Sequence, residues 1–264
     1  MSTRLARRKE REPMEIIAHR GASCDHPEQT LAAYDAALSE GADGIECDIR
    51  LTKDGHLVCS HDRTFERVAG DKRPIAELTR DDLPSINVGT AAEPQQPLLF
   101  STLLDLVEGT DCGLFVETKH PSVYGGQLEK TLVSVLRDRG QVDNPRLHVI
   151  SFSAMSLARM RHLEPSVHRI LLRREIQRPL GPILWRMDIP QAYGPSIINV
   201  KLRPGLIRRG DGCYTWTVNT RNDVMWAAQH GIDWLATDKP RQAREWLDEA
   251  SAPVSYTHLR AHET

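Results

Sequence analysis

Short apolar runs alternate with amphipathic segments along most of the chain. The first run, residues 15–19, contains two isoleucines and ends at a glycine turn, which predicts a buried strand. Residues 31–40 then carry apolar side chains at helical spacing behind Thr30, a residue type that caps helix N-termini. Residues 44–51 return to a strand pattern. This order of strand, helix and strand predicts a parallel sheet with helical crossovers.

The same alternation continues toward the end of the chain. The predicted strands of this series cover residues 15–19, 44–51, 113–119, 147–151, 168–172, 196–200, 213–218 and 232–237. Helices are predicted between several of them, at residues 98–107, 127–139, 154–162 and 222–231. An open doubly wound sheet would normally carry a glycine-rich nucleotide turn after its first strand, and none is present here. The sequence therefore predicts an α/β fold of the (β/α)8 TIM-barrel type.

Two segments after the second strand depart from the alternation. Residues 57–61 follow too closely for a parallel crossover, so they should return antiparallel as a hairpin arm. Residues 63–97 are long, polar and interrupted by four prolines, with one short helix expected near residues 76–82. Long loops in compact domains tend to be functional. We therefore expect a lid or rim over the active site.

The region from residue 173 to residue 212 fits a barrel least well. Residues 173–194 contain three prolines and have an irregular pattern. Residues 201–212 leave room for at most a turn or two of helix before the next strand. A barrel needs a crossover at that point, so the seventh strand–helix unit is predicted to be shortened.

The two ends of the chain lie outside the barrel pattern. Residues 1–12 are rich in arginine and are not followed by the apolar region of a signal peptide, so we expect a flexible basic tail. Residues 251–264 show neither a helical nor a strand pattern and look like translated adaptor sequence, a non-native or disordered tail. His258 and His262 are therefore left out of the functional reasoning. The domain prediction is one barrel over residues 13–250.

Composition excludes several classes of partner. The formal net charge of -2 gives no general electrostatic reason to expect nucleic acid or an anionic membrane. No stretch approaches the roughly 18 apolar residues of a membrane-spanning helix. The five cysteines are scattered without a CxxC pair, which is typical of reduced thiols. We expect a cytoplasmic protein that acts on a small molecule, with an oligomeric state that the sequence leaves open.

Three carboxylates stand near the ends of predicted strands. Glu46 and Asp48 are two residues apart, so their side chains share one face of a strand. Two like charges so close raise each other's pKa, and a hard divalent cation removes that penalty. Glu117 shares a face with Lys119 on another strand, so the two could offer a third ligand and an ammonium group for a phosphate oxygen. The competing interpretations are a solvated strand end and a surface ion pair.

Two histidines are expected near these carboxylates. His19 ends the first strand, at the face where barrels place catalytic residues, and the neighbouring Arg20 can bind phosphate through two hydrogen bonds. The hairpin returns His61 toward the same face. Because the ordinary pKa of histidine is about 6.5, one imidazole can accept a proton while the other donates one. A lone histidine is more often structural, whereas two beside a carboxylate cluster favour catalysis.

Several motifs resemble, in order and spacing, those of the glycerophosphodiester phosphodiesterases, and the resemblance covers about residues 15–240. They are His19-Arg20-Gly21, Pro27-Glu28-Gln29-Thr30, Gly41-Ala42-Asp43, Ile45-Glu46-Cys47-Asp48, Thr52-Lys53-Asp54-Gly55, His61-Asp62, Glu117-Thr118-Lys119, Ser151-Phe152, Trp216-Thr217-Val218-Asn219 and Thr237-Asp238-Lys239-Pro240. Gln29 stands where the family usually has asparagine, which is a mild departure.

The resemblance implies a TIM barrel that uses one divalent cation, Mg²⁺ or Ca²⁺, to hydrolyse glycerophosphodiesters to glycerol 3-phosphate and an alcohol. By motif, it implies that His19 and His61 form the acid–base pair. It also implies that Glu46, Asp48 and Glu117 bind the cation. The attacking group is either water or the neighbouring glycerol hydroxyl, and the latter would give a cyclic phosphate first.

The resemblance further implies phosphate contacts from Arg20 and Lys119 and a supporting role for Glu28 in the first loop. Trp216 lines the substrate pocket or is, equally well, a core aromatic residue. Two alternatives stay open. A lysophospholipase D would use the same site on an acylated diester and would be favoured by an apolar rim, and a non-catalytic phosphodiester-binding barrel would follow from a damaged seventh unit.

Overall fold

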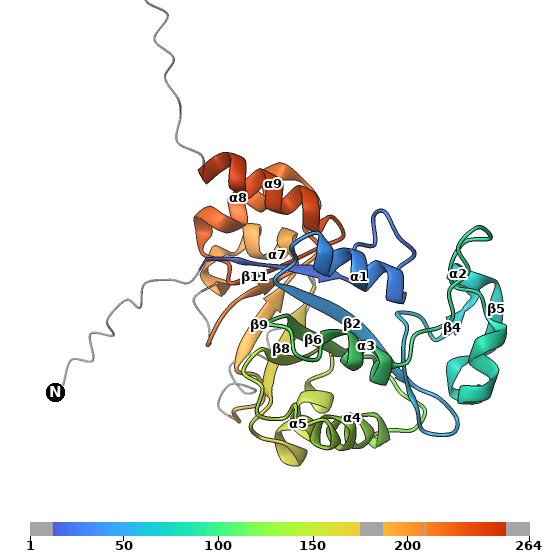
Figure 1. The fold of residues 1–264 in the computed structure, drawn as a ribbon. Coiled ribbons are helices and arrows are strands. Elements are labelled where there is room, and N and C mark those ends of the chain that lie inside the picture. The colour runs from blue at the N-terminus through green and yellow to red at the C-terminus, as the bar shows by residue number, and fades with distance from the viewer. Residues whose placement is uncertain (1–12, 175–186, 208–209, 252–264) are drawn as a thin grey trace, which may run out of the picture.

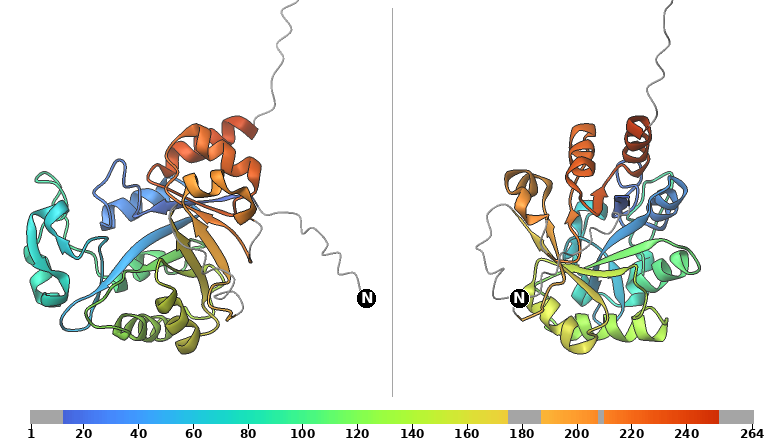
Figure 2. Two further views of the ribbon diagram at one scale, coloured as in Figure 1. Left: turned by 180° about the vertical axis from the view of Figure 1, so that it is seen from behind. Right: turned by 90° about the vertical axis from the view of Figure 1, so that its left-hand side faces the viewer.

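The computed structural model describes residues 13–174, 187–207 and 210–251. Within these ranges, eight parallel strands form a barrel with helices on its outside (Figures 1 and 2). In spatial order the strands are β10 (Tyr214–Thr215), β11 (Trp234–Thr237), β1 (Glu15–His19), β2 (Gly44–Leu51), β6 (Gly113–Thr118), β7 (Leu147–Ser151), β8 (His168–Arg173) and β9 (Ala192–Pro195). Both predicted tails lie outside the described residues, apart from Ser251. The TIM-barrel prediction is confirmed.

The helices that follow the strands cover the outer face of the barrel. They are α1 (Leu31–Ser39), α3 (Phe100–Val107), α4 (Gln127–Asp138), α5 (Ala154–Leu163), α7 (Ile197–Leu202), α8 (Arg221–His230) and α9 (Pro240–Ser251). Side chains that alternate along each strand serve two cores: Ile45 and Val116 pack with the helices, whereas Phe115 and Ile150 fill the barrel interior. Among the described residues, no helix combines the length and apolar character needed to cross a membrane.

The barrel closes between β9 and β10, its sixth and seventh strands in chain order. β9 and β10 meet through two parallel bridges, from Tyr193 to Cys213 and from Ser196 to Trp216. The Thr215 hydroxyl reinforces this seam by donating to the carbonyl oxygen of Pro195 at 3.0 Å. The closure brings residues near the end of the chain beside the first strand, because β11 pairs directly with β1.

The predicted strand at residues 196–200 is wrong. The strand is β9, which ends at Pro195, and Ser196 caps helix α7 by accepting a hydrogen bond from the backbone N–H of Asn199. Ile197 and Val200 are three residues apart and are buried on one side of the helix, while Ile198 is 58% exposed. A short apolar run does not distinguish a strand from a buried helix by its period alone. Because the helix begins at Ile197, the seventh unit keeps its crossover.

An insertion leaves the barrel after β2, as predicted. Strand β3 (Leu57–Cys59) pairs antiparallel with β2. Beyond it lie β4 (Thr64–Phe65), α2 (Glu66–Ala69), β5 (Asp71–Pro74) and two 3₁₀ turns, η1 (Ile75–Glu77) and η2 (Arg80–Ser85), in place of the single short helix expected. This insert has its own apolar cluster, which includes Phe65, Ile75 and Leu83. It stands to one side of the barrel (Figure 1).

Two histidines lie at the end of the barrel interior where the strands begin. His148 Nδ1 and His168 Nδ1 are 2.8 Å apart, and the His148 ring stacks on Phe115 with 4.4 Å between ring centroids. Burial lowers the pKa of His148 to about 3, and burial lowers that of His168 to about 4. Both imidazoles are therefore neutral in the folded protein at neutral pH.

Acidification is expected to destabilise the protein through this histidine pair. Below pH about 6.5 the unfolded chain protonates both residues, whereas the folded protein stays unprotonated until much lower pH, so protons favour unfolding. The loss should be about 5 kcal/mol between pH 7 and pH 4.5, roughly half of it from each histidine. Denaturant unfolding at both pH values measures it. The double variant His148→Phe/His168→Leu should lose less stability over the same interval, and an equal loss would contradict the assignment.

Candidate active site

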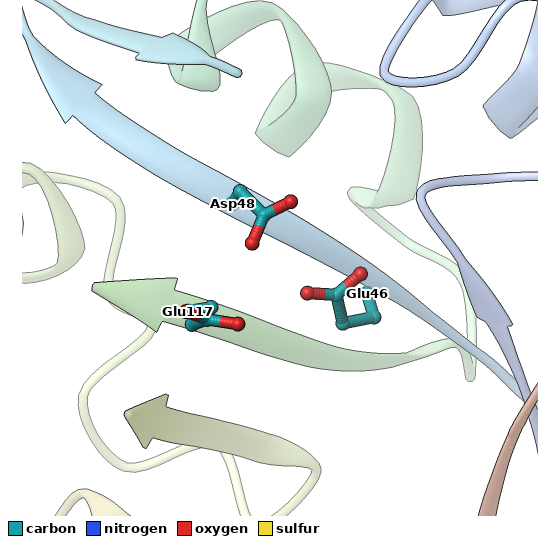
Figure 3. A group of neighbouring side chains, drawn as sticks. All are labelled: Glu46, Asp48 and Glu117. Carbon is teal, nitrogen blue, oxygen red and sulfur yellow. The ribbon is translucent and has the colours of Figure 1, made fainter. Parts of the chain in front are cut away.

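Three buried carboxylates converge inside the barrel (Figure 3). Glu46 and Asp48 lie on β2, and the strand register places Glu117 of β6 directly opposite Asp48. One oxygen atom from each carboxylate lies within 4.8 Å of the others. The structure thus brings together all three residues that the sequence motifs assigned to the metal site. Oxygen donors of this kind are the ligands that Mg²⁺ and Ca²⁺ prefer.

The cluster is electrostatically strained without a cation. Burial raises the pKa of Glu46 well above its ordinary value, and the Asp48 carboxylate adds to the rise. Burial likewise raises the pKa of Glu117 to about 7, again with a contribution from Asp48. Burial also favours a higher pKa for Asp48, but Lys119 and Arg20 outweigh it and lower that pKa to about 2. One carboxylate is therefore firmly ionised and its two neighbours resist ionisation.

Two cationic side chains contact these carboxylates. Lys119 Nζ lies 3.0 Å from Asp48 Oδ1 and 2.8 Å from Glu117 Oε1. Arg20 Nε lies 3.1 Å from Asp48 Oδ2, and the backbone N–H of Arg20 donates to Glu46 Oε2 at 3.1 Å. Both residues assigned to phosphate binding thus stand at the carboxylate cluster.

Asp48 is held in place by Gln29, a residue to which the sequence patterns assign no role. The Gln29 side chain donates through Nε2 to Asp48 Oδ2 at 2.6 Å and accepts the Asp48 backbone N–H at 3.3 Å. The hydroxyl of Tyr34 donates to Gln29 Oε1 at 2.8 Å and fixes the amide. Asp48 Oδ1, by contrast, is contacted by the Lys119 ammonium at 3.0 Å. Three buried carboxylates that face one another are the kind of oxygen donor set that a hard divalent cation takes.

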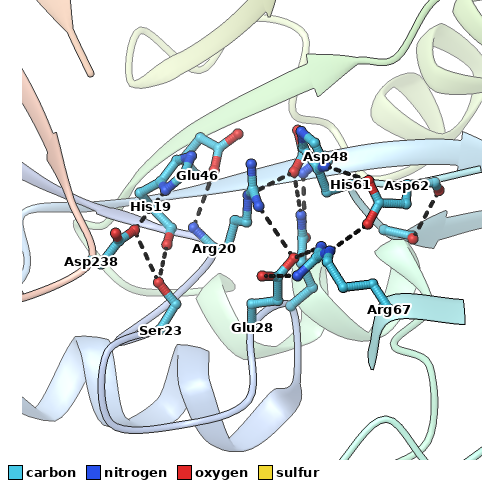
Figure 4. A network of polar contacts seen from close by, with 12 residues as sticks. His19, Arg20, Ser23, Glu28, Glu46, Asp48, His61, Asp62, Arg67 and Asp238 are labelled. Carbon is cyan, nitrogen blue, oxygen red and sulfur yellow. Dashed lines mark hydrogen bonds and ion pairs between the residues drawn. The ribbon is translucent and has the colours of Figure 1, made fainter. Parts of the chain in front are cut away.

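His19 is oriented by a carboxylate from the far end of the sequence (Figure 4). Its Nδ1 lies 2.7 Å from Asp238 Oδ1. Asp238 also accepts hydrogen bonds from Ser23 Oγ at 3.1 Å and from Asn219 Nδ2 at 2.6 Å. Asn219 and Asp238 both occur in the matched motifs, which was the only sequence signal for them. Their contact with the first strand depends on barrel closure.

His61 is oriented from the insert. Its Nδ1 lies 2.8 Å from Asp62 Oδ1, and Arg67 Nε donates to Asp62 Oδ2 at 2.6 Å. Arg67 also donates two hydrogen bonds to Glu28, at 2.7 and 2.8 Å, and Glu28 accepts a further one from Arg20 Nη1 at 3.2 Å. Figure 4 shows this chain of ion pairs, which links Arg20 to His61. Glu28 therefore supports Arg20, and no sequence pattern pointed to Arg67.

The pKa of His61 is lowered, first by burial and then by the positive charge of Lys119. Its imidazole is therefore neutral at neutral pH and can accept a proton. The Asp62 carboxylate acts in the opposite direction but is shared with Arg67, which weakens its pull on the ring.

One cavity joins these groups. Trp216 lines it, as expected, and its Nε1 donates to the carbonyl oxygen of Gly194 at 2.8 Å. Phe152 meets the Trp216 ring edge-on with 5.2 Å between centroids. The remaining lining residues include both histidines, two of the carboxylates and the two cations, namely His19, His61, Glu46, Glu117, Arg20 and Lys119. The cavity can therefore hold a phosphate group beside potential proton donors and acceptors.

Comparison with known proteins connects this site to a family. Residues 19–242 match the family model described as the glycerophosphoryl diester phosphodiesterase family. A relative from Mycobacterium tuberculosis strain H37Rv, named probable glycerophosphodiester phosphodiesterase 1, is 36% identical over 257 residues, which cover 90% of this chain and 93% of the relative. A glycerophosphodiester phosphodiesterase from Caldanaerobacter subterraneus subsp. tengcongensis is 29% identical over 236 residues, which cover 85% and 94%.

Solved structures share the fold. An Oleispira antarctica phosphodiesterase, in complex with the product sn-glycerol-3-phosphate, superposes with a TM-score of 0.81 at 22% identity, covering 89% of this chain and 97% of that one. A putative glycerophosphoryl diester phosphodiesterase from Silicibacter pomeroyi gives the same TM-score and identity and covers 92% and 95%. On the evidence of the family match and the Mycobacterium relative, the chain belongs to the glycerophosphoryl diester phosphodiesterase family.

Proposed function

We propose that this protein hydrolyses glycerophosphodiesters to glycerol 3-phosphate and an alcohol. The observation that carries the proposal is the convergence on one cavity of a buried carboxylate cluster and two histidines, each oriented by an aspartate. Family membership supports the substrate class. The product held by the Oleispira antarctica enzyme, which has the same fold, is the one expected here.

We infer that Glu46, Asp48 and Glu117 bind one divalent cation, Mg²⁺ or Ca²⁺. The donors are all carboxylate oxygen atoms, they are buried, and they lie close together. When bound, the cation supplies positive charge next to the oxygens of the phosphoryl group. Arg20 and Lys119 add to this charge, because both line the cavity beside the cluster.

His61 and His19 divide the two proton transfers in this proposal. His61 is the neutral imidazole, so it takes the proton from the nucleophile, which is water or the neighbouring glycerol hydroxyl. His19 gives a proton to the departing alcohol oxygen. Asp238 suits His19 to this role, since its contact with Nδ1 fixes the orientation of the ring. Glu28 supports Arg20, and Trp216 forms a wall against the substrate.

The non-catalytic alternative rested on a damaged seventh unit, and helix α7 removes that basis.

A cytoplasmic location remains a prediction. All five cysteines are free, as reduced thiols would be.

Turnover of purified protein tests the proposed activity. With Mg²⁺ or Ca²⁺ supplied, we expect release of glycerol 3-phosphate from at least one of glycerophosphocholine, glycerophosphoethanolamine and glycerophosphoinositol, measured by a coupled glycerol 3-phosphate assay. A lysophospholipid is included in the same assay. Release of head group from that substrate alone would select the lysophospholipase D alternative, and tight binding of all substrates without any product would contradict the catalytic proposal.

A further inference from the structure

A groove leads away from the reacting centre between β2, the insert and the segment after β6. Lys119 lines both this groove and the active-site cavity, so the two are neighbours. One wall comes from residues 74–76 of the insert and the other from residues 121–124. The hydroxyl of Tyr124 donates to the carbonyl oxygen of Ala76 and ties these walls together. The groove therefore has fixed walls and adjoins the active-site cavity.

Three cations and no carboxylate line the groove. The cations are Arg50, Arg63 and Lys119. Lys119 is neutralised by its contacts with Asp48 and Glu117. Within the part of the chain that the structure describes, Arg50 and Arg63 have no ion pair with a carboxylate. The groove is therefore lined by two arginines without a carboxylate among the lining residues, which favours an anionic occupant.

The strand geometry explains where this charge lies. Arg50 follows Glu46 and Asp48 at intervals of two residues, so its side chain leaves the same face of β2 one step nearer the strand end. Lys119 stands in the corresponding position after Glu117, since Asp48 and Glu117 are register partners. Arg50 and Lys119 therefore lie one step further along their strands than the carboxylates, on the side of the groove.

Arg50 and Arg63 line the same groove, one from β2 and the other from the insert. Arg50 uses Nε and Nη2 on the carbonyl oxygen of His61, at 3.2 and 2.6 Å. A guanidinium has five N–H donors, so Arg50 retains donors for a ligand. An anionic group at this position could accept hydrogen bonds from both arginines.

We propose that this groove binds the alcohol arm of the diester, and that Arg50 and Arg63 select alcohols that carry a negatively charged group over alcohols that carry an amine. The inference rests on the proposed phosphodiesterase function and specifies its substrate class. The apolar part of the walls suits the carbon skeleton of such an alcohol, because Ile75 and Val123 line the groove and Val123 is 80% exposed. An ammonium group would add a further positive charge to a site that has no carboxylate for it.

A matched series of substrates tests the proposal. The diesters of glycerol 3-phosphate with ethanolamine, N-acetylethanolamine and N-succinylethanolamine place a positive, a neutral and a negative group on the same alcohol. We expect kcat/KM of the wild-type protein to rise in that order, with a roughly tenfold step between the neutral and anionic diesters that appears mainly in KM.

Variants of Arg63 test whether the charge of this residue sets the substrate preference. Arg63→Gln should reduce the preference for the anionic diester, because Arg50 remains, and Arg63→Glu should abolish or reverse it. Arg63 is the better target because Arg50 also holds the backbone of His61. Lys72→Glu is the matched control, since Lys72 lies on β5 of the same insert, is 81% exposed and does not line the groove. It should keep the wild-type order.

Equal kcat/KM values for the three diesters would overturn the inference while leaving the proposed function in place, because hydrolysis itself would be observed. The inference is likewise overturned if Arg63→Glu keeps the wild-type order. If the wild-type protein hydrolyses none of these diesters and none of the unmodified ones, the proposed function fails and the inference fails with it.

Discussion

Replacing His19 with alanine is expected to reduce kcat by a factor of about 10² to 10⁴, the usual contribution of a general acid or base. The physical reason is the loss of a proton donor whose orientation Asp238 fixes at 2.7 Å. The side chain lines the cavity, so its truncation should leave most of the apolar core intact. Steady-state kinetics and an unfolding midpoint on the same preparation measure both effects.

The matched control for this experiment is His56→Ala. The His56 side chain is 43% exposed in the hairpin turn, lies 3.8 Å from Asp54, and does not line the cavity. Its replacement should leave kcat unchanged. Added imidazole should partly restore the His19→Ala variant if the lost function is proton transfer. A folded His19→Ala protein with near-normal kcat would remove His19 from the acid–base pair.

Removing divalent cations by exhaustive chelation is expected to abolish turnover, and Mg²⁺ or Ca²⁺ should restore it. Asp48→Asn should reduce activity by a factor of about 10² or more by weakening cation binding, because the amide lacks the charge that the ion needs. Asp48 is the informative position, since it is the carboxylate that stays ionised in the cluster. Activity is titrated against added cation, with the metal content of the protein determined separately.

The control substitution here is Asp54→Asn, in the turn between β2 and β3, which should keep the wild-type cation dependence. Full activity in a preparation shown to be free of metal would exclude the cation from the reaction. In that case Arg20 and Lys119, which already contact the carboxylates at 2.8–3.1 Å, would carry the charge neutralisation by themselves.

Most of the barrel was predictable from local sequence. Strands β1, β2 and β7 have the predicted bounds, because a short apolar run between turn residues leaves few alternatives to a buried strand. β9 was not predictable in the same way. Its four residues are Ala192, Tyr193, Gly194 and Pro195, which include two residue types that strands disfavour, and the more apolar segment that follows is a helix.

The carboxylate cluster was also predictable, since it needs only the two-residue period of strands and the alignment of parallel neighbours. The residues that orient the histidines were not. His19 and Asp238 are 219 positions apart, and Arg67 and Glu28 are 39 apart. No local period links such pairs, so the sequence could name them only through motif resemblance or not at all.

The sequence by itself thus determined the barrel and the face on which its acidic and basic side chains gather, because strand and helix periods are local properties of the chain. Tertiary structure alone decided which partner holds each catalytic candidate. It also placed Arg63 of the insert beside Arg50 of β2 in one groove. The reason is physical: these contacts depend on where β11 meets β1 and where the insert packs, and both are set by the packing of segments distant in the sequence.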